Sequence, residues 1–126
     1  MEKKVMIGGK EYRMRASALI PRLYRFKLGR DMVADMNQLT KSYQKILKSK
    51  NASEEEKRDA QFSVADLTIF ENVAFMMVKH AGEDIPDTPE EWLDSIEGVF
   101  SIYEILPDIL SLWSANNAQT SVPGKK

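Results

Sequence analysis

Apolar and polar residues alternate at the start of the chain, in the segment KVMIGGKEYRMR. The apolar residues recur at every second position on both sides of Gly8-Gly9; they are Val5, Ile7, Tyr12 and Met14. A period of two gives each strand one apolar face, and paired glycines accept the positive φ angles of a tight turn. The pattern predicts a β-hairpin over about residues 4–15. A lone hairpin is marginally stable, so this one should pack on a helix or on another chain.

The spacing of apolar residues then changes to three and four in SALIPRLYRFKLGRDMVADM. Ser17 is a candidate cap for a first helix, with Pro21 near its first turn and Gly29 at its end. Asp31 is the candidate cap of a second helix, which runs to the polar segment KSKNAS. Two helices joined by a short Gly-Arg-Asp break are therefore expected.

The next start signal is SEEE, in which Ser53 and Glu56 have the spacing of a capping box. It predicts the longest helix of the protein, ending near His80 and closed by Gly82. Apolar residues lie on two sides of this segment, and a helix of that kind is usually buried centrally. We expect the other elements to pack on it.

TPEE at residues 88–91 combines a cap, a proline at the first helical position and acidic residues in the first turn. It predicts a short helix that stops at Gly98. The apolar segment that follows contains Pro107, which should divide it into helices at about 99–105 and 107–115. Residues 116–126 are polar and small, as in a flexible tail.

Together these segments predict a mainly α protein with a small N-terminal β-hairpin (α+β), with about five helices packed on a long central helix. Its length of 126 residues suits one domain, here residues 1–115. The chain has no cysteine, and its N-terminal segment is charged. No stretch approaches the roughly 20 apolar residues that span a bilayer. These features favour a cytoplasmic protein.

Charge is distributed unevenly along the chain, although the net charge is only -1. Residues 1–30 carry a net charge of +7, residues 31–60 are neutral, and residues 61–126 carry -8. Such polarity is found in proteins that bind polyanions. It also predicts attraction between the two ends, either within one molecule or head to tail between copies in a homo-oligomer.

Candidate catalytic chemistry is sparse. His80 is the only histidine, and no spacing places a nucleophile or carboxylate beside it. Its position predicts a partly charged side chain at a helix C-terminus. The acidic residues of HAGEDIPDTPEE lack the register of a calcium loop. We therefore expect no enzyme activity, no metal and no cofactor.

The arginines and aromatic residues of residues 17–28 raise the possibility of a nucleic-acid surface. On a helical wheel, however, Tyr24 and Phe26 fall on the apolar arc, and Arg22 and Arg25 share a narrow remaining face. Two arginines are a small footprint for nucleic acid. The prediction is that both aromatic side chains pack inward, which disfavours a nucleic-acid partner.

Surplus apolar residues near the C-terminus give the clearest hint of a binding role. The segment ILPDILSLW is apolar nearly all round, which indicates either core or an interface with another chain. The candidate partner-binding residues are Leu106, Ile109, Leu110 and Trp113, together with Arg22 and Arg25.

The hairpin IGGKEYRMR, followed by SALIPRLYRFKLGRDMV with its Gly29-Arg30-Asp31 step, resembles the opening of tail assembly chaperones of long-tailed bacteriophages. The ending EEWLDSIEGVFSIYEILPDILSLWSANNAQTSVPGKK also resembles members of that family from prophages of Gram-positive bacteria. The resemblance covers most of the chain, and its motifs are structural rather than catalytic.

This resemblance implies a helper protein encoded between the tail tube protein and the tape measure protein. Such chaperones bind the long helical tape measure protein and keep it soluble while tube subunits polymerise around it. The implied partners are the tape measure protein and, as a second candidate, the tail tube protein, in the bacterial cytoplasm and not in the mature virion. Two other classes stay open, which are a structural tail or connector protein and a small nucleic-acid-binding regulator.

Overall fold

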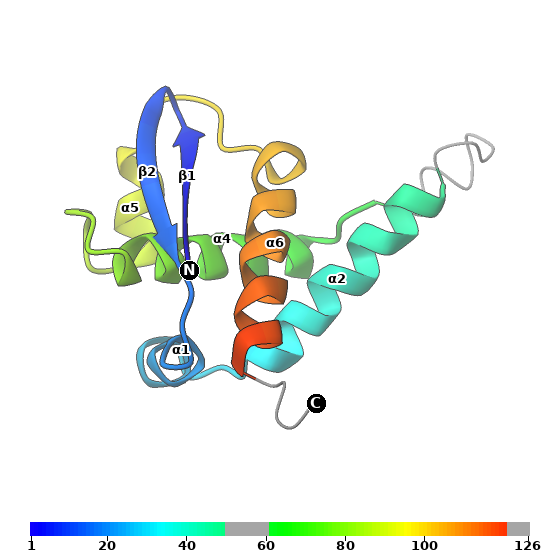
Figure 1. Ribbon diagram of the computed structural model, residues 1–126. Helices are drawn as coiled ribbons and strands as arrows, with labels where there is room; N and C mark the ends of the chain where they lie inside the picture. The colour runs from blue at the N-terminus through cyan, green and yellow to red at the C-terminus, as the bar shows by residue number, and fades with distance from the viewer. Residues whose placement is uncertain (50–60, 121–126) are drawn as a thin grey trace.

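The computed structural model describes residues 1–49 and 61–120, with side chains as far as residue 115. Within these ranges the protein is mainly helical, with one two-stranded antiparallel sheet and five helices (Figure 1). The elements are β1 (Glu2–Ile7), β2 (Lys10–Arg15), α1 (Ile20–Leu28), α2 (Met32–Lys48), α4 (Val64–His80), α5 (Pro89–Ser95) and α6 (Ile102–Thr120). The predicted α+β fold class is confirmed.

The N-terminal hairpin forms as predicted. Gly8 and Gly9 make its turn with φ angles of 60° and 82°, values that other residues rarely adopt. Val5 lies opposite Tyr12 in the register, and both are buried together with the other two apolar residues of the strands. This apolar face packs on the helices, since β2 contacts α4 and β1 contacts α6.

A close backbone approach fixes the turn of the hairpin to the segment after α5. The amide of Gly8 donates a hydrogen bond of 3.1 Å to the carbonyl of Val99. A Cβ atom added to Gly98 would lie 2.7 Å from the Cα of Gly8, closer than such atoms approach one another. Glycine at position 98 is therefore required for this contact.

The break between α1 and α2 follows the predicted pattern, but the start of α1 does not. Gly29 ends α1 in the left-handed conformation, and Asp31 caps α2 by accepting hydrogen bonds from two backbone amides. Ser17 is not the cap of α1, because the helix begins at Ile20 with Leu19 in the cap position. The Ser17 hydroxyl instead accepts a hydrogen bond from the amide of Leu19 and bonds with His80.

Helix α4 is central, as predicted, but the predicted start and length were wrong. Residues 61–63 are not helical, and α4 begins at Val64. Ser63 and Asp66 form a capping box there, and each accepts a hydrogen bond from the backbone of the other. The capping box expected at residues 53–56 lies outside the described residues. Helix α4 contacts β2, α1, α2, α5 and α6, and crosses behind the hairpin and α6 in Figure 1.

Helix α5 starts where the sequence predicts. Thr88 caps it by accepting a hydrogen bond of 3.2 Å from the amide of Glu91, and Pro89 is its first residue. The helix ends at Ser95 rather than at Gly98, because Ile96 adopts an extended conformation with ψ near 118°.

Helix α6 is continuous through Pro107, so the predicted division into two helices was wrong. The hydrogen bond that proline cannot make would go to the carbonyl of Tyr103, a residue that is 61% exposed. Ser101 supports the helix start by accepting a hydrogen bond from the amide of Tyr103. The helix also continues through residues 116–120, where a tail was expected; residues 121–126 lie outside the described part of the chain.

One hydrophobic core unites the hairpin with all the described helices. At one end of it the ring of Trp92 contacts Tyr12, Phe75 and Phe100 at centroid distances of 5.7, 6.1 and 5.6 Å. Trp92 thereby joins α5 to β2, to α4 and to the segment before α6. Across the described ranges, no helix has both the length and the apolar character needed to cross a membrane.

Candidate functional site

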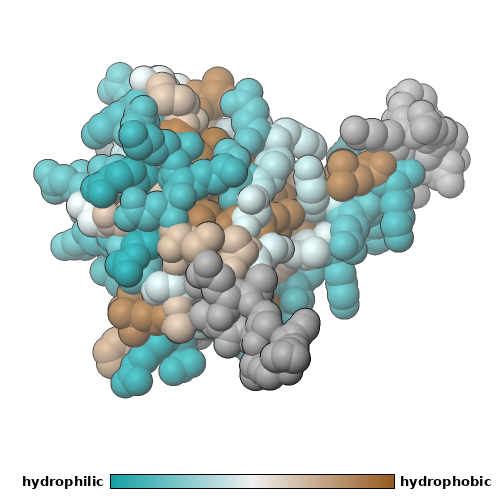
Figure 2. All heavy atoms as spheres, in the orientation of Figure 1, coloured by the Kyte–Doolittle hydropathy of each residue, from teal (hydrophilic) through white to brown (hydrophobic). Residues whose placement is uncertain are grey.

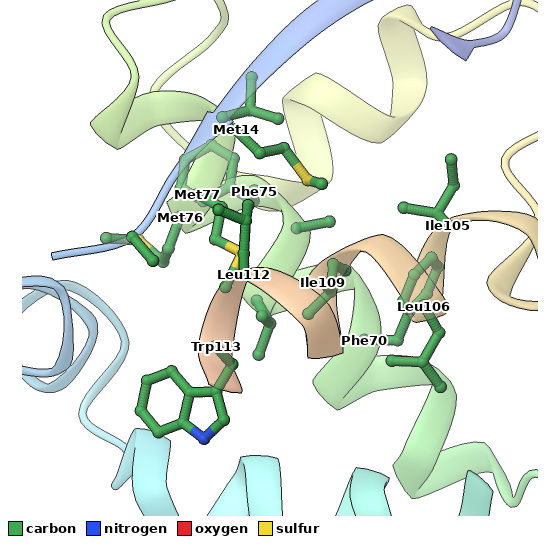
Figure 3. Packing of buried hydrophobic residues seen from close by; sticks show 14 of the residues in the cluster. Met14, Phe70, Phe75, Met76, Met77, Ile105, Leu106, Ile109, Leu112 and Trp113 are labelled. Atoms are coloured by element: carbon green, nitrogen blue, oxygen red, sulfur yellow. The ribbon is translucent and has the colours of Figure 1, made fainter. Parts of the chain in front are cut away.

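The apolar residues of α6 that were predicted to bind a partner belong to the core. Leu106 and Ile109 are 0% exposed and Trp113 is 8% exposed, while Leu110 is half-buried against the same cluster. Figure 3 shows Leu106 and Ile109 extending from α6 among core side chains that include Phe70 of α4. Because α6 packs against α4 and β1, these side chains are not open to another protein. Of the two alternatives that the sequence left open for this segment, the burial favours core over interface.

The two candidate arginines of α1 and the two aromatic residues near them differ in exposure. Arg22 and Arg25 are exposed on α1, as expected, and Tyr24 is fully buried. Phe26 is 86% exposed, so the prediction that it packs inward was wrong. On a helical wheel at about 100° per residue, the buried arc of α1 has Leu23 at one edge and Leu28 at the other. Phe26 falls outside this arc, next to the edge formed by Leu23.

An open groove between α1 and the C-terminal half of α4 brings the exposed aromatic ring next to apolar surface. Its volume is about 470 Å³, and the surface over α1 is partly hydrophobic in Figure 2. We call it the α1–α4 groove, and its lining residues are Leu23, Phe26, Lys27, Met76, Lys79 and His80. A groove of this size, with an apolar wall and polar groups at its edge, has the character of a binding site.

The two lysines of the α1–α4 groove are in different electrostatic states. Lys79 donates hydrogen bonds of 2.9 Å to the carbonyl of Ile85 and to a carboxylate oxygen of Asp87. The hydrogen bond from Lys79 to Asp87 and the charge of Lys79 lower the pKa of Asp87, and the charge of Lys27 lowers it further. Lys79 is thus occupied by groups of its own chain, whereas Lys27 is exposed at the edge of the groove.

His80 forms one end of the groove and is hydrogen-bonded to a side chain from the segment before α1. Its Nε2 lies 2.8 Å from the Ser17 hydroxyl. Burial lowers the pKa of His80, and the positive charges of Arg15 and of the N-terminal amine lower it further. The lowered pKa favours the neutral imidazole, whereas the sequence suggested a partly charged one.

A second, smaller hollow lies on the other side of α1 and includes Arg25. It has a volume of about 340 Å³ and lies between α1 and the start of α2. Val33, which is 49% exposed, forms part of its wall. Arg22 lines neither hollow, so the structure does not unite the two arginines in one cavity.

A buried hydrogen-bond network holds α1 in place. The Tyr24 hydroxyl donates to a carboxylate oxygen of Asp35 at 2.6 Å, and Arg30 donates to both oxygens of the same carboxylate at 2.8 Å. Burial by itself would raise the pKa of Asp35, but the hydrogen bonds from Arg30 and Tyr24 outweigh it and lower the pKa. The network joins α1 and the following turn to α2.

Within residues 1–49 and 61–120, no three acidic or histidine residues are placed to hold a metal ion. Comparison with known proteins gives no match to a family model, to a curated protein or to a solved structure.

Proposed function

We propose that this protein is a tail assembly chaperone of a long-tailed phage or prophage. In this role it binds the tape measure protein in the host cytoplasm and keeps it soluble while the tail tube polymerises. The resemblance of the hairpin, of the Gly29-Arg30-Asp31 step and of the C-terminal segment supports the proposal. The observation that carries it is the α1–α4 groove, with Phe26 86% exposed at its edge.

An open apolar groove suits a helical client. An amphipathic helix binds by placing its apolar face in such a groove, with anchors spaced at three or four residues. Phe26 supplies an exposed aromatic contact at the edge of the groove and Met76 an adaptable apolar wall within it. A long client offers many such helices, so several weakly bound copies would cover it through avidity.

The proposal predicts that Phe26→Ser weakens client binding and leaves the protein folded. Loss of an aromatic anchor from an interface typically costs about 2 kcal/mol, or roughly a 30-fold loss of affinity. The measurement is co-expression with the long helical protein encoded next to this gene, followed by assay of the client in the soluble fraction. Wild-type protein should keep the client soluble, and the variant should not.

Val64→Ser is the matched control for this experiment. Val64 is 81% exposed on the first turn of α4, outside the α1–α4 groove, so its replacement removes a similarly exposed apolar side chain. Equal loss of solubilisation in both variants would count against the groove as the site. A wild-type protein that leaves every neighbouring client insoluble would count against the chaperone function itself.

The exposure of Phe26 also favours one other function. An exposed aromatic ring on the same helix as the exposed Arg22 and Arg25 is a combination that single-stranded nucleic acid binds, by stacking and by phosphate contacts. A gel shift with single-stranded DNA or RNA that weakens with salt and with Phe26→Ser would support that function. A structural tail protein, by contrast, would be detected by mass spectrometry in purified particles.

A further inference from the structure

An apolar stripe runs along α1 and borders the α1–α4 groove. Leu19, in helical conformation at the cap position, is 50% exposed and Phe26 is 86% exposed, while Leu23 lies in the wall of the groove. Spacings of four and three residues place these side chains on one face of the helix, over about two turns. Hydrophobic atoms are visible over α1 in Figure 2. We call these three residues the α1 stripe.

Positive charge lies on both sides of the α1 stripe. At about 100° per residue, Arg22 falls on one side of it and Lys27 on the other. Both residues are exposed, and neither α1 nor the lining of the groove contains an acidic residue. Among the residues that the structure describes, no carboxylate lies within 4.0 Å of either cation. Asp87, whose pKa Lys27 helps to lower, is paired with Lys79.

An apolar stripe between two such cations is complementary to one class of helix. We propose that the α1–α4 groove binds an amphipathic helix of a partner protein that has apolar anchors three or four residues apart and aspartate or glutamate on both sides of them. Anchors at this spacing are neighbours on a helix, about 5–6 Å apart between their Cβ atoms. Two of them can therefore enter the same groove, whose volume is about 470 Å³.

The flanking carboxylates of the partner helix pair with Arg22 and Lys27. A helix with lysine or arginine at those positions would bring like charges together, so the site discriminates against basic segments. The inference rests on the proposed function for the identity of the partner. It adds the kind of sequence that the site accepts.

Three fluorescein-labelled peptides of about 18 residues, longer than the minimum for an isolated helix, test this specificity with the full-length protein. The first has leucine and phenylalanine anchors at three- and four-residue spacing with glutamate on both sides. The second has lysine in place of each glutamate, and the third has serine in place of each anchor. Fluorescence anisotropy measures the affinities at about 50 mM and about 500 mM NaCl, which differ strongly in charge screening.

The glutamate peptide should bind about tenfold more tightly than the lysine peptide at low salt, because exposed ion pairs are individually weak. This preference should shrink at high salt. The peptide without anchors should lose at least about tenfold in affinity, since the apolar contacts supply most of the binding.

Charge reversal on the protein is the sharper test. Arg22→Glu/Lys27→Glu should invert the order, so that the lysine peptide binds more tightly than the glutamate peptide. Arg22→Gln/Lys27→Gln removes both charges without adding acids and should bind the two peptides alike. The matched control is Lys41→Glu/Lys45→Glu, at exposed positions of α2 outside the groove, which should keep the wild-type order. Circular dichroism melts check that each variant folds.

Three results would overturn the proposal. They are equal affinity of the wild type for both charged peptides, an order that charge reversal leaves unchanged, and no binding of any peptide up to about 1 mM. A groove occupied by a second copy of the chain would give the last result. No client is present in these measurements. Failure of the peptides with a client that stays soluble would therefore remove the acidic-helix specificity alone, whereas peptide binding with an insoluble client would count against the chaperone function alone.

Discussion

Asp35 is a buried carboxylate that accepts hydrogen bonds from Tyr24 and Arg30. Its residue is 4% exposed, and the hydrogen bonds from Tyr24 and Arg30 keep it ionised, with a pKa below the ordinary value. A carboxylate whose pKa is lowered on folding stabilises the protein above its unfolded pKa, about 3.9 for aspartate. That stability is lost as the pH falls from this value through the lower pKa of the folded state.

Asp35→Asn should therefore destabilise the protein at neutral pH but much less in acid. The amide cannot accept the charged hydrogen bonds of Arg30 as strongly, and the expected loss is about 1–3 kcal/mol near pH 7. Urea unfolding of wild type and variant from pH 7 down to about pH 3 measures the difference, which should shrink below about pH 4. Asp84→Asn, at an exposed position, is the control and should change stability little at any pH. A difference that is constant with pH would contradict the assigned role of the Asp35 charge.

The residues whose environments were predicted wrongly lie at the edges of the apolar and capping patterns of the sequence. Phe26 belongs to a plausible apolar arc, but how much of that arc is buried depends on where α4 crosses α1. Ser17 has the chemistry of a helix cap, yet its hydroxyl bonds with His80, which is 63 residues away in the chain. Such long-range partners leave no signal in local spacing.

At the level of helices and strands, the sequence correctly predicted the helix ends that depend on interactions within a few residues. The left-handed Gly29, the cap at Asp31 and the Thr88-Pro89 start all act within a few residues, and all are found where expected. The continuity of α6 was not predictable in this way. Pro107 is compatible with the helix because the rest of α6 packs on α4 and β1, and this tertiary packing outweighs one missing hydrogen bond.

Pro107→Ala should accordingly stabilise the protein. The substitution adds the amide that can donate to the carbonyl of Tyr103, and Pro107 is exposed, so no core contact is lost. Proline in a helix interior costs about 3 kcal/mol, but its rigidity in the unfolded chain returns about 1 kcal/mol, which leaves a gain of about 1–2 kcal/mol. Urea denaturation of the two proteins tests this. Lower stability of the variant would show that the proline ring makes a contact of its own.

At the level of the whole molecule, the sequence predicted the composition of the core better than the composition of the surface. Alternation placed Val5 and Tyr12 inward, and the double apolar stripe made α4 central, both correctly. The apolar α6 segment was compatible with either core or interface, because periodicity cannot decide between faces when nearly every face is apolar. The assembled fold resolves the choice by covering α6 with α4 and β1.

Stability and client binding should therefore depend on different residues. Leu106 is 0% exposed in the core, so Leu106→Ala should lower the free energy of unfolding by about 2–5 kcal/mol. Adding Ile109→Ala and Trp113→Ala should abolish the cooperative transition, since domains of this size are stable by only about 5–15 kcal/mol. Phe26→Ser, at an exposed position, should change unfolding by no more than about 0.5 kcal/mol. Thermal and urea unfolding of wild type, Leu106→Ala, the triple variant and Phe26→Ser measures both effects. A triple variant that unfolds like wild type would return α6 to consideration as the binding surface.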